Sequence, residues 1–165
     1  MTRPADKSAV RLHDYATSIV WTGNLGDGTS SYEAYGRQHE ISCVGKPPIQ
    51  GSSDPAFKGD PSRYNPEDLL VASLSACHML WYLHLCAKAG VTVVDYRDEA
   101  QGQMAEERTG GGRFTNVVLR PVVTITAESD RQKAHELHHP AHANCFIASS
   151  VNFPVRCEPK IVALD

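Results

Sequence analysis

The sequence predicts an α+β fold in which antiparallel β-sheets are wrapped around one central apolar helix. The helix is indicated by the stretch 69–87, LLVASLSACHMLWYLHLCA, which is apolar on most sides. Stretches rich in β-branched residues precede and follow it, and Gly-rich turns between them favour antiparallel hairpins. The apolar stretch is nearly long enough to cross a bilayer, but His78 and His84 interrupt it. We therefore expect the core helix of a globular protein.

The composition argues against two classes of partner. The chain has 165 residues, room for one domain, so a single domain over 1–165 is expected. Apolar residues make up 41% and charged residues 21%, with a net charge of −3. No two Lys or Arg residues are adjacent, so neither nucleic acid nor an anionic membrane is an expected partner. The first eight residues lack the apolar core of a secretory signal, which predicts a cytoplasmic protein.

The part of the chain before the helix is predicted to contain two strands and a long loop. The first strand is expected at 16–22 and is followed by a Gly-rich turn over 23–28. A second strand lies between 29 and 44. The stretch 45–64 is rich in Pro, Gly and Ser and is predicted to be a loop, and loops of this length are usually functional.

The ends of the helix carry clear signals. Asn65 is a good N-cap, Pro66 suits the first helical position, and two acidic residues follow in the first turn. Gly90 is a typical residue to end a helix. Beyond it we predict, in order, a strand at 91–104, a turn at 108–112, a hairpin partner at 113–128, a helix at 129–139, a helical piece at 143–151 and a closing strand at 155–164.

The five cysteines do not suggest a disulfide framework, because their number is odd, their spacing is wide and no CxxC motif occurs. Cys77, inside the apolar helix, is the first candidate for a reactive thiol. Cys145 is the second, because it lies near the expected start of a short helix, whose dipole favours a thiolate. Cys43, Cys86 and Cys157 are predicted to be small core residues.

A group of histidines follows the hairpin. Steps of three and four residues bring several imidazoles near one helical face, a spacing that can bind zinc. Pro140 interrupts the helix, however, and no HExxH motif completes the set, so we expect a polar helix face and no metal or cofactor. The group comprises His135, His138, His139 and His142, followed by Cys145.

The helix start and the first cysteine resemble those of a known family. The segment 65–70, Asn-Pro-Glu-Asp-Leu-Leu, followed by Ser75-Ala76-Cys77, is similar to the osmotically inducible protein C and organic hydroperoxide resistance (OsmC/Ohr) family. The spacing from Glu67 to Cys77 matches that family, and Cys145 fits its second cysteine. The predicted order of elements also follows the family's order.

This resemblance implies an intertwined homodimer that acts as a thiol-dependent peroxidase on organic hydroperoxides or hydrogen peroxide. Cys77 would then be the peroxidatic thiolate, oxidised to a sulfenic acid, and Cys145 would resolve it as a disulfide that an external dithiol reduces. The alternative is a non-enzymatic dimeric stress or binding protein of the same fold, in which the cysteines are core residues. A zinc protein using the histidine group is a third hypothesis.

The resemblance also assigns roles to a carboxylate and an arginine. Glu67 matches the family carboxylate that orients a catalytic arginine. Ten helical residues place it roughly 15 Å from Cys77, so Glu67 is expected to serve the partner's site. Arg37, on the second expected strand, is the predicted arginine, and Arg63, just before the helix, is the alternative.

Overall fold

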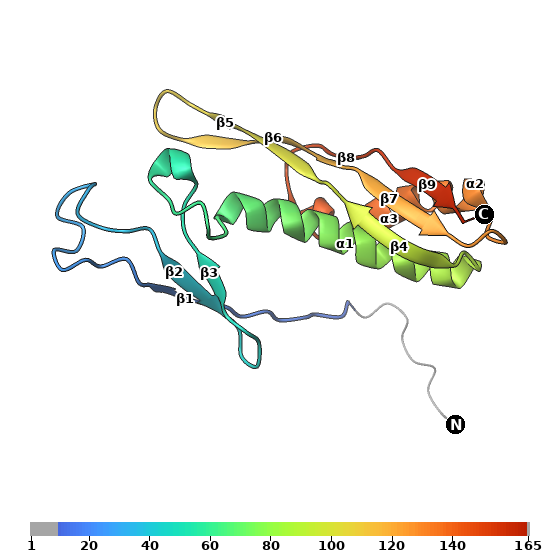
Figure 1. Cartoon of the computed structure of the whole chain (residues 1–165), viewed down its shortest axis with the longest axis horizontal. Coiled ribbons are helices and arrows are strands. Elements are labelled where there is room, and N and C mark those ends of the chain that lie inside the picture. Colours follow the sequence, from blue (N-terminus) through green and yellow to red (C-terminus); the bar gives the residue numbers. More distant parts are fainter. Residues whose placement is uncertain (1–9, 165) are drawn as a thin grey trace. The chain divides into compact units, whose positions relative to one another are not determined.

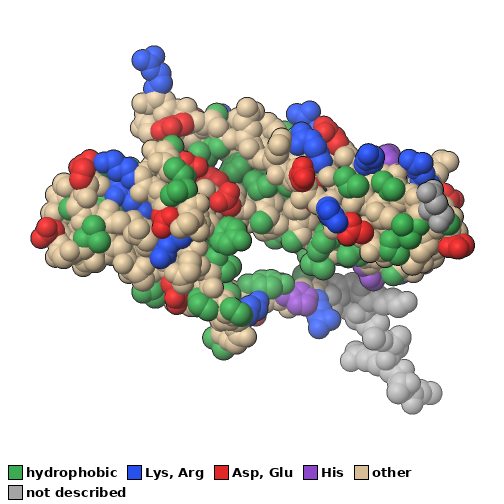
Figure 2. Space-filling model, in the orientation of Figure 1, with side chains coloured by type: hydrophobic (Ala, Val, Ile, Leu, Met, Phe, Trp, Pro, Cys, Tyr) green, Lys and Arg blue, Asp and Glu red, His purple; other side chains and the backbone are tan. Residues whose placement is uncertain are grey.

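The computed structural model describes residues 10–164, and its contacts divide the chain into two compact units, one ending at Asn65 and the other beginning at Pro66. Each unit has its own sheets. On the face shown in Figure 2, Lys and Arg side chains are interspersed with Asp and Glu.

The first unit is a three-stranded antiparallel sheet in the order β1-β2-β3 (Figure 1). β1 (Ser18–Trp21) and β2 (His39–Ser42) confirm the two predicted strands. The prediction of a loop over 45–64 is wrong in part, because β3 (Ile49–Gly51) and a 3-10 turn (Pro55–Phe57) lie within it. β3 forms because β2 has a free edge on the side away from β1, and this edge satisfies the backbone of a short strand.

The second unit is organised around α1 (Pro66–Ala89), a single helix of 24 residues that confirms the prediction at both ends. Gly90 follows it with φ 75°, the left-handed conformation that glycine adopts most easily. By length and composition, α1 is the one helix among residues 10–164 that could cross a membrane, but it also packs on a core. Every fourth residue along one face is buried, namely Leu74, His78, Tyr82 and Cys86.

Two predicted strands of the second unit are each divided. The expected strand at 91–104 is β4 (Val93–Asp98) followed by β5 (Gln101–Glu106), and its hairpin partner is β6 (Gly112–Leu119) followed by β7 (Pro121–Ile125). The predicted turn at 108–112 joins β5 to β6. The β6–β7 stretch is interrupted at Arg120, whose backbone N–H donates to the Asp98 carboxylate at 2.6 Å. Arg120 therefore pairs neither with β5 nor with β4.

The C-terminal elements also differ from the prediction. α2 (Arg131–Glu136) is capped by Asp130 as expected but ends early, and α3 (His138–Asn144) replaces the expected piece at 143–151. Pro140 does not stop the helix, because it lies in the first turn of α3, where backbone N–H groups have no intrahelical acceptor. A 3-10 turn (Ala148–Ser150) follows α3. The predicted closing strand is divided into β8 (Val155–Cys157) and β9 (Lys160–Ala163).

Both closing strands pair in parallel, β8 with β6 and β9 with β7, so the sheets are mixed rather than purely antiparallel. The two resulting sheets have the orders β4-β7-β9 and β5-β6-β8. The chain passes from one sheet to the other three times, from β4 to β5, from β6 to β7 and from β8 to β9. The three crossings lie at the same level, after Asp98, Leu119 and Cys157. We call this level the seam.

The core of the second unit lies between the sheets and the helices, and it has two clusters. The larger joins α1, α2 and α3 to β7 and β9, and includes Tyr82 and Cys86. The smaller joins Leu74 of α1 to Val117 and Leu119 of β6. Leu74 and Tyr82 thus belong to different clusters, and His78 lies between them on the same face of α1.

Candidate functional site

Two cysteine side chains meet where α1 packs against α3. Cys77 lies in the middle of α1 and is half-buried, and Cys145 directly follows α3 and is 1% exposed. The two thiols lie close enough to influence each other, and the backbone N–H of Ala148 donates to the Cys145 sulfur at 3.4 Å. Burial, and then the neighbouring Cys77 thiol, raise the pKa of the Cys145 thiol to about 11. Cys145 therefore keeps its proton at neutral pH.

Glu67 does not join this pair within its own chain. It lies in the first turn of α1, which continues without a break to Cys77 and beyond. At about 1.5 Å per residue, the two side chains start roughly 15 Å apart along the helix axis. The role of Glu67 stays a prediction.

The two candidate arginines belong to the first unit. Arg37 has its guanidinium carbon 4.2 Å from the ring centroids of both Tyr32 and Tyr35, and it donates hydrogen bonds to the carbonyl oxygens of the same two residues. Arg63 instead lies 3.5 Å from a carboxylate oxygen of Asp60 and donates to a side-chain amide. The rings and carbonyls hold Arg37 in one orientation. Which arginine serves the cysteines stays a prediction.

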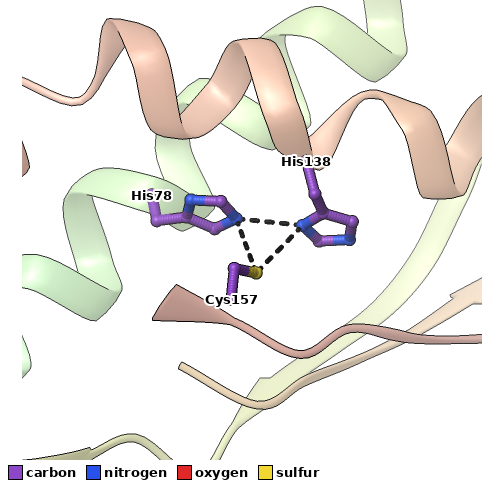
Figure 3. A group of neighbouring side chains, drawn as sticks. All are labelled: His78, His138 and Cys157. Carbon is purple, nitrogen blue, oxygen red and sulfur yellow. Dashed lines mark hydrogen bonds between the residues drawn. The ribbon is translucent and has the colours of Figure 1, made fainter. Parts of the chain in front are cut away.

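A second group of side chains, which we call the His-His-Cys cluster, lies at the junction of the two core clusters (Figure 3). His78 comes from α1, His138 from the first turn of α3 and Cys157 from the end of β8. The Nε2 atom of His78 is 2.9 Å from Nδ1 of His138, and the Cys157 sulfur is 3.5 Å and 3.8 Å from these two nitrogens. These three potential metal-ligand atoms therefore converge on one place, and in the absence of an ion one of the two nitrogens donates a hydrogen bond to the other.

The surroundings hold the cluster rigid and favour neutral imidazoles. The ring of Tyr82 stacks on His138 with centroids 3.9 Å apart. Burial lowers the pKa of His78 to about 4 and that of His138 to about 3, so both are uncharged at pH 7. Burial also raises the pKa of Cys157 to about 12, and the carboxylate charge of Asp98 adds to this rise. The outer ring nitrogens, Nδ1 of His78 and Nε2 of His138, have no hydrogen-bond partner among the described residues.

A cavity of about 290 Å³ opens beside the cluster. Both His138 and Cys157 line it, together with polar side chains of α2 and α3 that include Glu136 and His142. The cavity has room for several water molecules and gives small solutes a route to the Cys157 sulfur.

The sequence analysis did not find this cluster. It considered zinc binding by the histidines at 135–142 with Cys145, but of these only His138 takes part. Cys157 was predicted to be a small core residue, and it does pack, half-buried, against the smaller core cluster, but its sulfur also contacts two imidazoles. One signal in the sequence could have indicated it. His78 is a histidine in the row of every fourth helix residue that otherwise consists of Leu74, Tyr82 and Cys86, and a polar side chain on such a face needs a partner.

The chain belongs to the OsmC-like family: the family model described as OsmC-like protein matches residues 59–160. Among solved structures, an OsmC-like protein of unknown function from Vibrio cholerae is 32% identical, with a TM-score of 0.81, over 90% of this chain and 99% of that one. No curated protein matches the sequence.

Two further solved structures are similar in fold. An organic hydroperoxide resistance protein OsmC from Legionella pneumophila is 15% identical, with a TM-score of 0.65, over 92% of this chain and 98% of its own. An organic hydroperoxide resistance protein from Elizabethkingia anophelis is 16% identical, with a TM-score of 0.64, over 92% of this chain and 99% of its own. Both identities are low, so these two structures indicate the fold alone.

Proposed function

We propose that the protein is a thiol-dependent peroxidase that reduces organic hydroperoxides through Cys77 and Cys145. The observation that carries the proposal is the proximity of these two thiols, which are 68 positions apart in the sequence but meet where α1 packs against α3. Membership of the OsmC-like family supports it, as do the names of two proteins of the same fold, which are organic hydroperoxide resistance proteins.

The reaction proceeds in three balanced steps. The Cys77 thiolate attacks the terminal peroxide oxygen, the O–O bond breaks, and the substrate leaves as an alcohol after taking one proton. The resulting sulfenic acid is attacked by the sulfur of Cys145, so a disulfide forms and water leaves. An external dithiol then reduces the disulfide and restores both thiols.

The different surroundings of the two thiols assign their roles. Cys77 is half-buried and is the more exposed of the two thiols, so a peroxide reaches its sulfur more easily than that of Cys145. Cys145 is buried, and its raised pKa keeps it protonated until Cys77 has been oxidised. Because the two thiols lie close enough to influence each other, we expect a disulfide to form between them without a change in the fold.

The proposal includes a homodimer. Because Glu67 lies about 15 Å along α1 from the Cys77 of its own chain, it acts in the proposal at the site of the partner subunit, where it orients the arginine. Arg37 is the proposed arginine, with Arg63 as the alternative. A cytoplasmic location is also proposed, since a reducing compartment supplies dithiols.

The test is turnover of cumene hydroperoxide with dithiothreitol as the reductant. We expect turnover by the wild-type protein, none by Cys77→Ser, and a single oxidation per chain in Cys145→Ser, trapped as a sulfenic acid with dimedone. Cys43→Ser is the matched control, because it removes another half-buried thiol that has no role in the proposed reaction.

Peptide mapping after one equivalent of peroxide should find an intrachain disulfide between Cys77 and Cys145. Equal turnover by Cys77→Ser and wild type would falsify the peroxidase proposal and favour a non-enzymatic protein of the same fold. A wild-type protein whose Cys77 is overoxidised while Cys145 stays free would make Cys145 structural.

A further inference from the structure

We propose that the His-His-Cys cluster binds one divalent transition-metal ion of the zinc type, with two imidazoles and one thiolate as ligands and the fourth position open to the adjacent cavity. The site is separate from the proposed peroxide chemistry, because none of its three side chains belongs to the Cys77–Cys145 pair.

The spacing of the three donor atoms fits such an ion. Bond lengths of about 2.0–2.1 Å to nitrogen and about 2.3 Å to sulfur, at tetrahedral angles, give separations of about 3.3 Å between nitrogens and about 3.6 Å between nitrogen and sulfur. The observed separations are 2.9 Å for the nitrogens, and 3.5 Å and 3.8 Å from the nitrogens to sulfur. One ion can therefore reach all three atoms with shifts of a few tenths of an ångström.

The chemistry of the donors points to the same class of ion. Neutral imidazole and thiolate together suit zinc and its neighbours in the first transition row, whereas magnesium and calcium prefer oxygen ligands. An imidazole binds a metal through its unprotonated nitrogen, so in the metal-bound form the ring protons of His78 and His138 lie on their outer nitrogens, Nδ1 and Nε2. The Cys157 thiol releases its proton to solvent as its sulfur binds.

The charge around the cluster favours a cation. Two neutral imidazoles and one thiolate bound to a divalent ion leave one net positive charge. The carboxylates of Asp98 and Glu158 both place negative charge beside Cys157, and Asp98 also acts on His78. Asp98 is fixed in place by hydrogen bonds from the backbone N–H of Arg120 and the hydroxyl of Ser75.

The cluster is also preorganised and accessible. Its ligands come from three separate elements, α1, α3 and β8, which the core already holds together. Metal binding therefore costs little conformational entropy. The adjacent cavity supplies the route for the ion and space for a water molecule as the fourth ligand.

The test is a Co²⁺ titration of the full-length protein without a histidine tag, kept reduced and first freed of metal with EDTA. We expect a thiolate-to-cobalt charge-transfer band that saturates at one Co²⁺ per chain and disappears when Zn²⁺ is added. Cys157→Ser should lose the band and bind Zn²⁺ more than about 100-fold more weakly, because losing even an outer partner of a ligand costs 10–100-fold. Cys77→Ser, the matched control from the neighbouring position on α1, should keep both.

A second measurement does not depend on the folding of a variant. Bound Zn²⁺ should protect Cys157 of the wild-type protein from iodoacetamide and leave the rate at Cys43 unchanged, as read by peptide mapping. No band at stoichiometric Co²⁺, a band that survives in Cys157→Ser, or a band lost in Cys77→Ser would each overturn the proposal. None of these outcomes bears on peroxide turnover, which is measured on metal-free protein.

Discussion

Replacing Asp98 by alanine should destabilise the second unit by about 3 kcal/mol. One carboxylate oxygen accepts the backbone N–H of Arg120 at 2.6 Å, and the other accepts the hydroxyl of Ser75 at 2.5 Å. A hydrogen bond to a charged group contributes about 1.5–3 kcal/mol, and we take the lower value for both because Asp98 is only half-buried. The variant also leaves the N–H of Arg120 without its acceptor at the seam.

Two variants separate hydrogen bonding from charge. Asp98→Asn should cost only about 1 kcal/mol, because its carbonyl still accepts from Arg120 and its amide donates to the Ser75 oxygen. Glu99→Ala, at the exposed neighbouring position, should change stability by less than about 0.5 kcal/mol.

The assay is urea unfolding followed by the fluorescence of Trp81 on α1, in a Trp21→Phe background so that only the second unit is reported. The midpoint should fall at an unchanged slope. If Asp98→Ala unfolds at the same urea concentration as Glu99→Ala, the reasoning about the seam is refuted.

Three further predictions concern the second unit of the metal-free protein. The folded-state pKa values of His78 and His138, about 4 and about 3, lie below the unfolded value near 6.5, so the unfolded chain binds more protons as the pH drops from 7 to 5. The free energy of unfolding should therefore fall over this range, by up to about 2 kcal/mol for His78 alone. The urea midpoint measures this fall, and His138→Gln should reduce it. Tyr82→Phe removes the buried hydroxyl that donates to the carbonyl of Ala134 at 3.0 Å and should cost about 1 kcal/mol, with an unchanged midpoint contradicting the role of that hydrogen bond. Gly90→Ala forces a side chain into the left-handed conformation and should lower the thermal midpoint, whereas Gly111→Ala, at an exposed glycine without a positive φ and with open space for a methyl group, should not.

Local signals were sufficient for α1 and for the hairpin turn. Asn65, Pro66 and Gly90 act on the helix through neighbouring backbone groups, so their effect is visible in a short window of sequence. The divided strands could not be predicted in this way. Residues 113–128 form one continuous β-rich stretch, and its interruption depends on a carboxylate about 22 positions earlier, which accepts the N–H of Arg120.

The same difference between local signals and long-range pairing separates Cys77 and Cys145 from Cys157. Cys77 and Cys145 were selected from their positions in predicted helices and then from the resemblance to a known family, and the structure places their thiols close enough to influence each other. The contact between Cys157 and His78 spans 79 positions and depends on β8 pairing in parallel with β6. The prediction of one closing strand at 155–164 concealed that pairing, so Cys157 was assigned to the core.

The seam restricts where the chain can change length. β4, β7 and β9 form one ladder and β5, β6 and β8 the other, and all three stretches cross between ladders at a common level. A one-residue insertion in any single stretch would reverse its inward and outward side chains beyond that point, while the two neighbouring stretches kept theirs. Length variation among related chains should therefore concentrate in the turn between β5 and β6, and the spacing from Leu119 to Pro121 should stay constant.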